Sequence, residues 1–437
     1  MTSIPTSELA RDLSTLLSLV GGGWSASEAE RVSFEPDGAD RVGIELGAQD
    51  LVAWVDSADR RERVFVTSSD GGQVSEEGRL LMRKIVAVLN QDLLVVGDRI
   101  ETQEIWKALS PTRFLRAAAR LSNISTDHLV GRIRIFEAAA RQTYEGSPFV
   151  GSVVMPHNIR TFRAHAVERF RPFSSPMTFG QALLREKWLK PFLEGGDFAL
   201  VTVSRKGMAR GFTDATSTWA SSLVSPPTAQ LEGLYGYLTP GTSVLSASPS
   251  GDIYFALPSG ATFVNSKGLW RYQNWSPLKQ VLSRHCRPEA VENVMQLVRS
   301  SSYSHHGALF VILPIGGDVL GVIPDHGALG RSAETLRATV EGIQISDPLA
   351  VRLLDVASRI DGAVVLDERG GVIDVASMVA EPSIDALSRA GHCQLRRFSG
   401  ARSTAAWNAS IQGLAIKVSD DGPIDVYERG HQVFHSA

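Results

Sequence analysis

Two short glycine-containing segments in the C-terminal third of the chain hold residues that could do chemistry together. The first is Asp361-Gly362-Ala363, which follows a helix-like stretch and opens an apolar strand. Gly362 and Ala363 have little or no side chain, so a bound molecule can approach the backbone closely. The Asp361 carboxylate can accept hydrogen bonds from a sugar hydroxyl, or lie beside a metal ion during phosphoryl transfer.

The second segment precedes a helix expected over residues 405–411 and consists of Gly400, Ala401, Arg402, Ser403 and Thr404. A loop that enters a helix offers free backbone amides and a favourable dipole, which together hold phosphate. The guanidinium fork of Arg402 is suited to phosphate oxygens. Trp407, shortly after this loop, is a candidate for stacking on a base or for a dimer contact. The two segments predict a nucleotide site in which one loop holds the sugar and the other the phosphates.

The order of four segments carries a family resemblance. They are Gly307-Ala308-Leu309, Asp361-Gly362-Ala363, Gly400 to Ala406, and Val418 to Gly422. In this order they resemble the domain of diadenylate cyclases, the enzymes that join two ATP molecules into cyclic di-AMP. That family has an Asp-Gly-Ala motif at a strand start, a Gly-Thr-Arg-His-Arg-Ala-Ala segment at a loop–helix junction, and a following strand with Ser-Glu-Glu. The resemblance covers less than half of the chain.

The departures from the family pattern concern catalysis. Where the family has Arg-His-Arg, this chain has Arg402-Ser403-Thr404, so an imidazole and a second guanidinium are absent. ATP cyclisation develops negative charge on the transferred phosphoryl group, and a single arginine can contribute roughly 10³ to 10⁵ in rate. Ser403 and Thr404 can still donate hydrogen bonds to a phosphate. The pattern therefore favours binding without efficient catalysis.

Relatives with this fold and altered motifs are proposed nucleotide sensors in bacterial conflict systems. The chain is most similar to the group called DACNV, which consists of proposed sensor domains. The resemblance implies a sensor that binds an adenine nucleotide or a cyclic dinucleotide and passes the signal to the N-terminal regions or to an effector protein. It implies no certain cofactor, and an enzymatic role is the less favoured alternative.

Two alternatives stay open. An active, divergent diadenylate cyclase would use Asp361, Arg402 and Asp420 for catalysis, with Mg²⁺ or Mn²⁺ held by Asp420 and Asp421. Each of those aspartates is one methylene shorter than the glutamate at the matching family position. Because such enzymes place two active sites face to face, this alternative requires a homo-oligomer. The other alternative is an assembly module that kept the fold and lost the ligand.

Each candidate residue also has an ordinary structural explanation. Asp361 could cap a turn before a strand, and Arg402 could be a surface arginine. Asp420-Asp421-Gly422 has the composition of a hairpin turn. His305 and His306 stand ahead of the Gly307 strand, but neighbours on an extended chain face opposite ways, which disfavours a shared metal.

The elements around these residues alternate between helix and strand. Residues 277–284, 288–302 and 348–360 have apolar positions at helical spacing. Residues 307–314 and 361–366 are continuous apolar strands of the kind buried on both faces of a sheet. Further strands are expected over 371–379, 413–419 and 424–427. This pattern predicts an α/β domain over 266–437, in which a mixed β-sheet is covered by helices.

Two other regions precede that domain. Residues 1–145 combine an amphipathic helix near Leu9 and Leu13 with short strands and further helices, which predicts an α+β region of unknown role. Residues 146–265 hold two apparent hairpins, around Arg205-Lys206-Gly207 and Pro258-Ser259-Gly260, and are expected to form a mostly β module. No nuclease, protease or Walker-type signature is present in either region.

The composition is that of an ordinary soluble protein. Hydrophobic residues make up 43% and charged residues 21% of the 437 residues, and the formal charge is -3. That charge gives no bulk attraction to nucleic acid or to an anionic membrane. No apolar run is long enough to cross a bilayer, no secretory signal is visible, and the two cysteines are far apart. We therefore expect a cytoplasmic protein without a membrane partner.

Overall fold

The computed structural model describes residues 6–20, 24–31, 44–46, 50–57, 60–68, 75–96, 102–122, 125–144, 147–166, 168–194, 196–203, 207–216, 231–327 and 334–436. These residues form two compact units, one ending at Asn274 and the other beginning at Trp275. The division expected from the sequence, with boundaries at 145 and 265, is thereby corrected. The first two regions belong to one unit, and the last boundary falls later in the chain. As predicted, the fold is mixed α/β.

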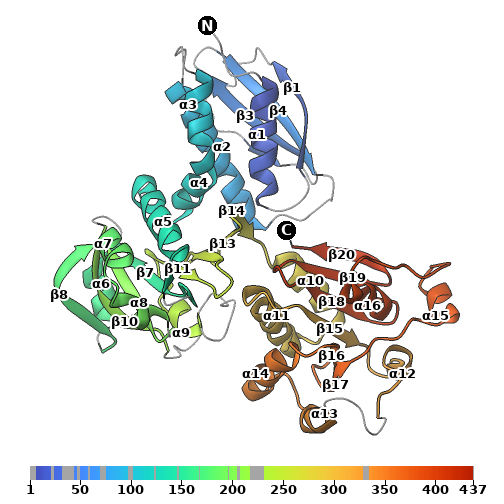
Figure 1. The fold of residues 1–437 in the computed structure, drawn as a ribbon. Coiled ribbons are helices and arrows are strands. Elements are labelled where there is room, and N and C mark those ends of the chain that lie inside the picture. The colour runs from blue at the N-terminus through green and yellow to red at the C-terminus, as the bar shows by residue number, and fades with distance from the viewer. Residues whose placement is uncertain are drawn as a thin grey trace. The chain divides into compact units, whose positions relative to one another are not determined.

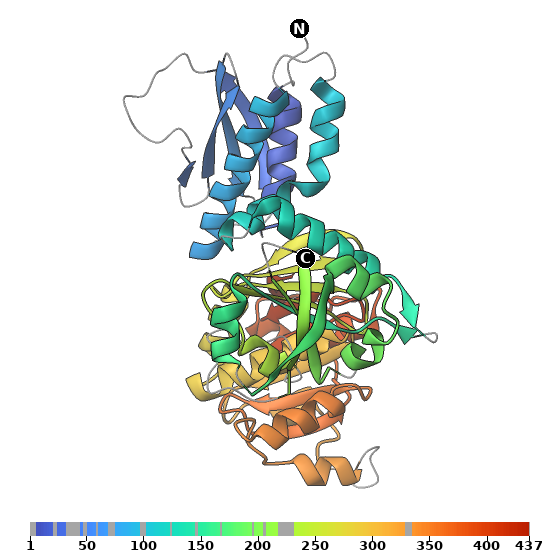
Figure 2. The same cartoon turned by 90° about the vertical axis from the view of Figure 1, so that its left-hand side faces the viewer.

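The N-terminal unit begins with an antiparallel four-stranded sheet in the order β1-β4-β3-β2, against which α1 and α2 pack (Figures 1 and 2). The amphipathic stretch predicted near Leu9 is α1, and Leu13 and Leu17 on it are fully buried. The elements of this part are α1 (Thr6–Ser18), β1 (Trp24–Arg31), β2 (Ile44–Leu46), β3 (Asp50–Ser57), β4 (Arg60–Ser68), α2 (Glu76–Val96), α3 (Thr102–Leu109), η1 (Ser110–Thr112), α4 (Arg113–Leu121) and α5 (Thr126–Ala140).

The rest of this unit contains an eight-stranded sheet in the order β14-β13-β12-β11-β7-β9-β10-β8. Both predicted hairpins are confirmed, as β9–β10 and β12–β13. One parallel pair, β7 with β9, makes the sheet mixed. The elements are β5 (Thr143–Tyr144), β6 (Ser147–Pro148), β7 (Ser152–Pro156), α6 (Ile159–His165), β8 (Phe170–Thr178), α7 (Phe179–Leu184), α8 (Leu189–Glu194), β9 (Phe198–Val203), β10 (Met208–Asp214), α9 (Glu232–Tyr235), β11 (Thr242–Ala247), β12 (Ile253–Ala256), β13 (Thr262–Ser266) and β14 (Leu269–Gln273).

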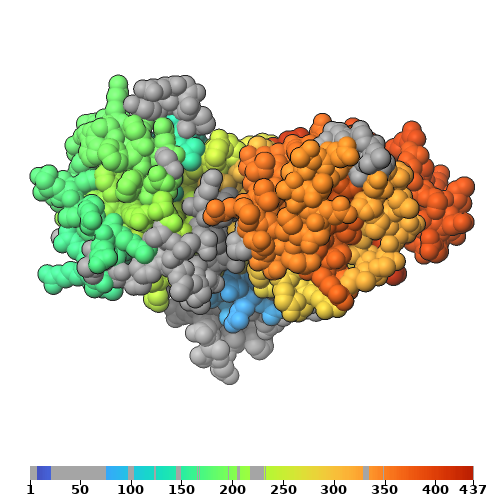
Figure 3. Space-filling model, turned by 90° about the horizontal axis from the view of Figure 1, so that it is seen from below, coloured from blue at the N-terminus to red at the C-terminus, as the bar shows by residue number. Residues whose placement is uncertain are grey.

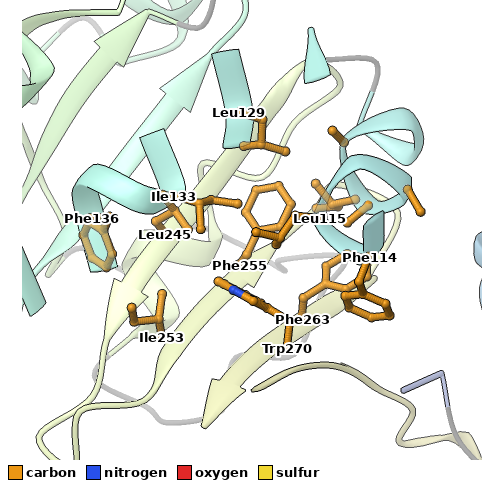
Figure 4. Close-up of a cluster of buried hydrophobic side chains, with 14 of the residues drawn as sticks. Phe114, Leu115, Leu129, Ile133, Phe136, Leu245, Ile253, Phe255, Phe263 and Trp270 are labelled. Atoms are coloured by element: carbon orange, nitrogen blue, oxygen red, sulfur yellow. The ribbon is translucent and has the colours of Figure 1, made fainter. Parts of the chain in front are cut away.

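A single apolar core explains why the boundary lies after β14. Figure 4 shows Phe114 from α4 beside Phe263 and Trp270 from the last strands of the eight-stranded sheet, with Phe136 from α5 in the same cluster on the side of Leu245. The rings of Phe114 and Phe263 meet edge to face at 5.8 Å. The Trp270 indole donates to Glu137 at 2.9 Å. Trp270, which the sequence assigns to the C-terminal domain, is therefore a core residue of the N-terminal unit.

The C-terminal unit has one six-stranded mixed sheet in the order β17-β16-β15-β18-β19-β20 (Figure 1). β15 runs parallel to β16, and the other neighbouring strands are antiparallel. The elements are α10 (Ser276–His285), α11 (Pro288–Tyr303), β15 (Ala308–Leu313), α12 (Val319–Val322), α13 (Glu334–Val340), α14 (Pro348–Ala357), β16 (Ala363–Asp367), β17 (Val372–Ser377), α15 (Ile384–Arg389), α16 (Ala401–Ser410), β18 (Leu414–Val418), β19 (Ile424–Glu428) and β20 (His431–His435).

The alternation of side chains along β15 shows how helices cover both faces of this sheet. Phe310 and Ile312 pack into a core with α10, α11 and α14, whereas Leu309 and Val311 pack into a second core with α15 and α16. All six residues of β15 are buried. A strand buried on both faces is the arrangement that its continuous apolar sequence predicts.

The outer side of α14 carries apolar residues. Leu349 and Val356 are each 61% exposed, and the orange atoms near residue 350 form part of the surface in Figure 3.

Within the described parts of the chain, no helix is both long and apolar enough to span a bilayer.

Asp425 on β19 gives the C-terminal unit a pH-dependent stability. Its carboxylate accepts hydrogen bonds from Lys417 at 2.9 Å and Gln432 at 2.8 Å, and lies 2.7 Å from His435 Nδ1. Burial raises the pKa of Asp425, but the bonds to His435 and Lys417 outweigh burial and the pKa is lowered. The resulting stabilisation is complete above the unfolded pKa, near 4, and is lost as the pH falls through the folded pKa.

We therefore expect wild type to melt at a higher temperature than Asp425→Asn at neutral pH, and the difference to shrink as the solution is acidified below about pH 4. Differential scanning calorimetry of both proteins over a pH series measures this difference. Melting curves that stay equally separated down to the acid limit would contradict the assignment.

Candidate functional site

The two predicted loops lie at the same end of the six-stranded sheet. β15 and β16 are parallel, with Phe310 opposite Val364, so both strands begin on one side. β18 is antiparallel to β15, with Ala308 opposite Val418, so β18 ends on that side. We call this side the amino end of the sheet. It brings together residues that precede β15 and β16 and residues that follow β18.

An ion pair places the start of α16 at the amino end as well. Arg402 Nη1 lies 3.1 Å from Asp420 Oδ1, and the two side chains are 34% and 77% exposed. Gly307, just before β15, lies against both. A Cβ on Gly307 would come within 1.9 Å of the Asp420 carboxylate and 2.0 Å of the Arg402 guanidinium. Three of the four family-like segments therefore meet here, and only a glycine fits at position 307 without displacing the pair.

The first turn of α16 has backbone amides that no side chain caps. Gly400 is the N-cap residue, has an extended backbone and provides no side-chain bond. The first internal bond of the helix runs from the Thr404 amide to the Gly400 carbonyl. The helix begins at Ala401, whereas the sequence places its start at Ala405. Arg402 and Ser403 thus lie in the first turn, where unsatisfied amides and the helix dipole favour an anion.

Thr404 has a different task from the one expected. Its hydroxyl oxygen accepts a hydrogen bond from the Phe398 amide at 3.0 Å and lies near the carbonyls of Phe398 and Gly400. These bonds close the loop that leads into α16. Thr404 therefore shapes the loop, and Ser403 is the hydroxyl of this segment that the helix start leaves available.

Backbone packing fixes the position of Gly362. Its φ of +116° is one that side-chain-bearing residues rarely adopt, and a Cβ would lie 2.5 Å from the Ala376 carbonyl carbon. Ala376 itself has a φ of +51°. The Arg337 guanidinium holds this stretch of β17 by donating to the carbonyls of Val375, at 2.7 Å, and Ala376. The end of β17 thus forms a rigid support behind Gly362.

Asp361, the residue directly before Gly362, lies at the surface. It is exposed, and its side chain makes no hydrogen bond or ion pair with another described residue. The parallel register of Phe310 with Val364 extends toward Gly307 and Asp361 at the strand starts. Asp361 therefore lies one strand away from the position where Gly307 contacts Arg402 and Asp420, with its carboxylate available to a ligand.

The stacking role expected for Trp407 is wrong. Trp407 is fully buried, its indole donates to the Gly430 carbonyl at 2.9 Å, and its ring meets His392 at 5.4 Å. It faces the core between α16 and the sheet because five residues along an α-helix place it on a different face from Arg402, about 140° around the axis. A side chain in that position can reach neither a base nor a second molecule.

The metal site predicted at Asp420 and Asp421 lacks a third ligand. Among the residues that the structure describes, no group of three or more His, Cys, Asp or Glu side chains could hold a metal ion. Asp420 is paired with Arg402 instead.

His306, which the sequence analysis considered only as a metal ligand and disfavoured, is a neighbour of the site. Burial lowers its pKa, Arg359 lowers it further, and Asp355 and Asp420 act in the opposite direction. A lowered pKa leaves the imidazole neutral near pH 7, where it can donate or accept a hydrogen bond. The signal in the sequence was its position next to Gly307, which gained importance only once Gly307 was located.

Comparisons with known proteins add nothing to this geometry. No family model and no curated protein matches the chain. Among solved structures it is similar to one described as the hypothetical membrane spanning protein from Bacillus cereus, with 17% identity and a TM-score of 0.24. That match covers 37% of this chain and 69% of the other. A likeness this weak carries no argument about fold or function.

A cavity of about 870 Å³ lies at the opposite end of the same sheet. Its walls include Ile312 at the end of β15 and Glu368 just after β16. Asp361, Arg402 and Asp420 do not line it. The predicted loops therefore share one end of the sheet, and this cavity is separate from them.

Proposed function

We propose that the C-terminal unit binds an adenine nucleotide or a cyclic dinucleotide at the amino end of its sheet, as the ligand-binding part of a sensor. The observation that carries this proposal is the meeting of Arg402, Asp420 and Gly307 at the end where β16 begins. The order of these segments along the chain resembles the diadenylate-cyclase domain. In that resemblance, too, they surround a nucleotide.

Each part of the ligand has a suitable partner. The uncapped amides at the start of α16 and the Arg402 guanidinium suit phosphate oxygens. The exposed Asp361 carboxylate suits the hydroxyls of a ribose. Phosphate would draw Arg402 away from Asp420. An exposed ion pair is weak, and a phosphate group carries more negative charge than the Asp420 carboxylate. Ligand binding and rearrangement of the ion pair are thus coupled.

Binding without cyclisation fits the side chains better than catalysis does. Ser403 and Thr404 replace cationic residues of the family motif, and the Thr404 hydroxyl is already bonded to the Phe398 backbone. Asp420 is paired with an arginine rather than placed in a metal-binding cluster. Little is then left to neutralise the charge that develops on a transferred phosphoryl group.

In this proposal the ligand state of the site is passed to the N-terminal unit or to an effector protein. The resemblance to the DACNV group implies a role in a bacterial conflict or signalling system, and we propose that the protein acts in the cytoplasm. Sensing of this kind needs no cofactor, and Mg²⁺ or Mn²⁺ would belong to the active-cyclase alternative.

Two measurements on the full chain test the proposal. Titration calorimetry with ATP, ADP, AMP and cyclic di-AMP should give heat with at least one of them, and heat with none would leave the assembly-module alternative. Incubation with labelled ATP and Mg²⁺ or Mn²⁺ should give no cyclic dinucleotide. Product that disappears in Asp361→Ala would instead establish the cyclase.

Asp420→Asn separates binding from catalysis. Without the carboxylate, Arg402 is free and the phosphates meet one negative charge less. We expect metal-free ATP, measured by calorimetry in EDTA, to bind about 2- to 5-fold more tightly, since exposed ion pairs contribute at most about 1 kcal/mol. Asp385→Asn, on exposed α15, is the charge-matched control and should leave the affinity unchanged. Weaker binding by Asp420→Asn would show that Asp420 itself contacts the ligand.

A further inference from the structure

The cavity at the opposite end of the sheet is placed where ligands of α/β proteins usually bind. It lies beyond the carboxyl ends of the parallel pair, with Ile312 and Pro314 from the end of β15 and Glu368 from the end of β16 in its walls. In open α/β sheets, ligands bind in the crevice outside the carboxyl ends of the strands. Its volume, about 870 Å³, is within the range of small-molecule sites. We call it the carboxyl-end pocket.

The pocket lining contains more cationic than anionic side chains. Its lining includes Arg284, Arg287, Arg389 and Arg429. Two of the lining acids already have partners. Glu428 lies 3.1 Å from His285 and 3.5 Å from Arg284, and the Asp318 carboxylate accepts the Gly321 amide at the start of α12.

Three of the arginines have no carboxylate partner among the described residues. Arg287 is the N-cap residue of α11 and makes no side-chain capping bond. Arg389 donates only to the carbonyl of Asp385, at 3.4 Å. Arg429 is held through its backbone alone. Against these three guanidinium groups stand the carboxylates of Asp318 and Glu368, so the lining keeps one positive charge in excess, which favours an anion.

The backbone presents Arg429 to the pocket at some conformational cost. Its φ is +48°, a region that few non-glycine residues occupy. Its amide donates to the Ser410 carbonyl at 2.7 Å, and its carbonyl lies 2.8 Å from His392 Nε2. Ser410 is the last residue of α16, and His392 lies in the segment that follows α15. Strained backbone that is held on both sides is found preferentially at ligand sites.

We propose that the carboxyl-end pocket binds a small phosphate-bearing molecule through Arg287, Arg389 and Arg429. Guanidinium forks match phosphate oxygens in geometry and charge. The lining also includes the glycines Gly316 and Gly413 and the apolar residues Ile312 and Ile411. This site is independent of Asp361 and Arg402, so one molecule of the protein can hold ligands at both ends of one sheet.

The experiment uses inorganic pyrophosphate as the probe and the full chain in the Arg402→Gln background, which removes the principal cation of the amino end. Calorimetry should show pyrophosphate binding in this background. Adding Arg287→Gln and Arg429→Gln together should weaken it by about tenfold or more, since hydrogen bonds to charged groups contribute about 1.5–3 kcal/mol. Arg389→Gln alone should weaken it less.

The charge-matched control is Arg352→Gln with Arg369→Gln, two exposed arginines outside the pocket lining, which should leave the affinity unchanged. Circular dichroism verifies that each variant is folded. Absence of pyrophosphate binding in the Arg402→Gln protein, or equal affinity in the pocket and control variants, would overturn this proposal. Neither result bears on ATP binding by wild type at Asp361 and Arg402, so the two proposals fail separately.

Discussion

Replacing Arg402 by glutamine is expected to weaken the binding of ATP by about 10- to 100-fold, because a hydrogen bond to a charged group contributes about 1.5–3 kcal/mol. Glutamine keeps part of the side-chain length but has neither the charge nor the planar fork. Arg402 is one-third exposed and bonded only to Asp420, so the variant should fold like wild type. Titration calorimetry with ATP in EDTA measures the affinity.

A matched control is Arg369→Gln, which removes the same charge from the exposed turn between β16 and β17 at the other end of the sheet. Its affinity for ATP should equal that of wild type. If both variants lose affinity to the same extent, the effect is one of overall charge. If neither does, the phosphates are not held by Arg402, and the amino end of the sheet is the wrong site.

Truncating Trp407 to alanine should destabilise the C-terminal unit by about 3–5 kcal/mol, the usual cost of removing a buried large aromatic side chain. The indole is fully buried and its bond to the Gly430 carbonyl ties α16 to the turn before β20. The loss should be visible as faster hydrogen exchange of the β15 and β18 amides, which report on the stability of this unit alone.

Trp407→Phe is the informative companion variant. It keeps most of the apolar volume and removes the hydrogen bond, so it should lose clearly less stability than Trp407→Ala. Neither variant should change ATP affinity at a temperature where it is folded. A folded Trp407→Phe protein that binds ATP much more weakly would restore the stacking role that burial argues against.

The main strands and helices of the C-terminal unit were predictable because a strand buried on both faces is continuously apolar and a packed helix has apolar residues at helical spacing. The apolar run at β15 and the helical spacing in α11 and α14 gave elements close to the observed ones. β20 was not predicted, since its alternation is interrupted, three of its five residues are polar and none is buried. The short helices α12, α13 and α15 have too few turns to show a period.

The domain boundary was misplaced for a different reason. The segment that begins at Leu269 was assigned to the C-terminal domain because it directly precedes the first helix of that domain in the sequence. This strand pairs with β13 at the edge of the eight-stranded sheet, and the contacts of Trp270 with Glu137 and of Tyr272 with Ser75 tie it to helical parts of the N-terminal unit. Partners so distant in sequence leave no local pattern.

The candidate site was predictable in its loops and not in its individual roles. Arg402 and Asp420 could be named from the order of motifs, but their pairing with each other, and the reason for Gly307 beside them, depend on how β15, β18 and α16 assemble. The carboxyl-end pocket had no sequence signal at all. Its arginines come from separate segments, and none of those segments contains a motif.

The most direct measurement is a crystal structure of the full chain with a non-hydrolysable ATP analogue at saturating concentration. We expect density for the phosphates against the Ala401 and Ser403 amides and the Arg402 guanidinium, with the ribose beside Asp361 and the Arg402–Asp420 pair opened. An analogue bound elsewhere in the molecule, or an amino end that stays closed around an intact ion pair at saturation, would contradict it.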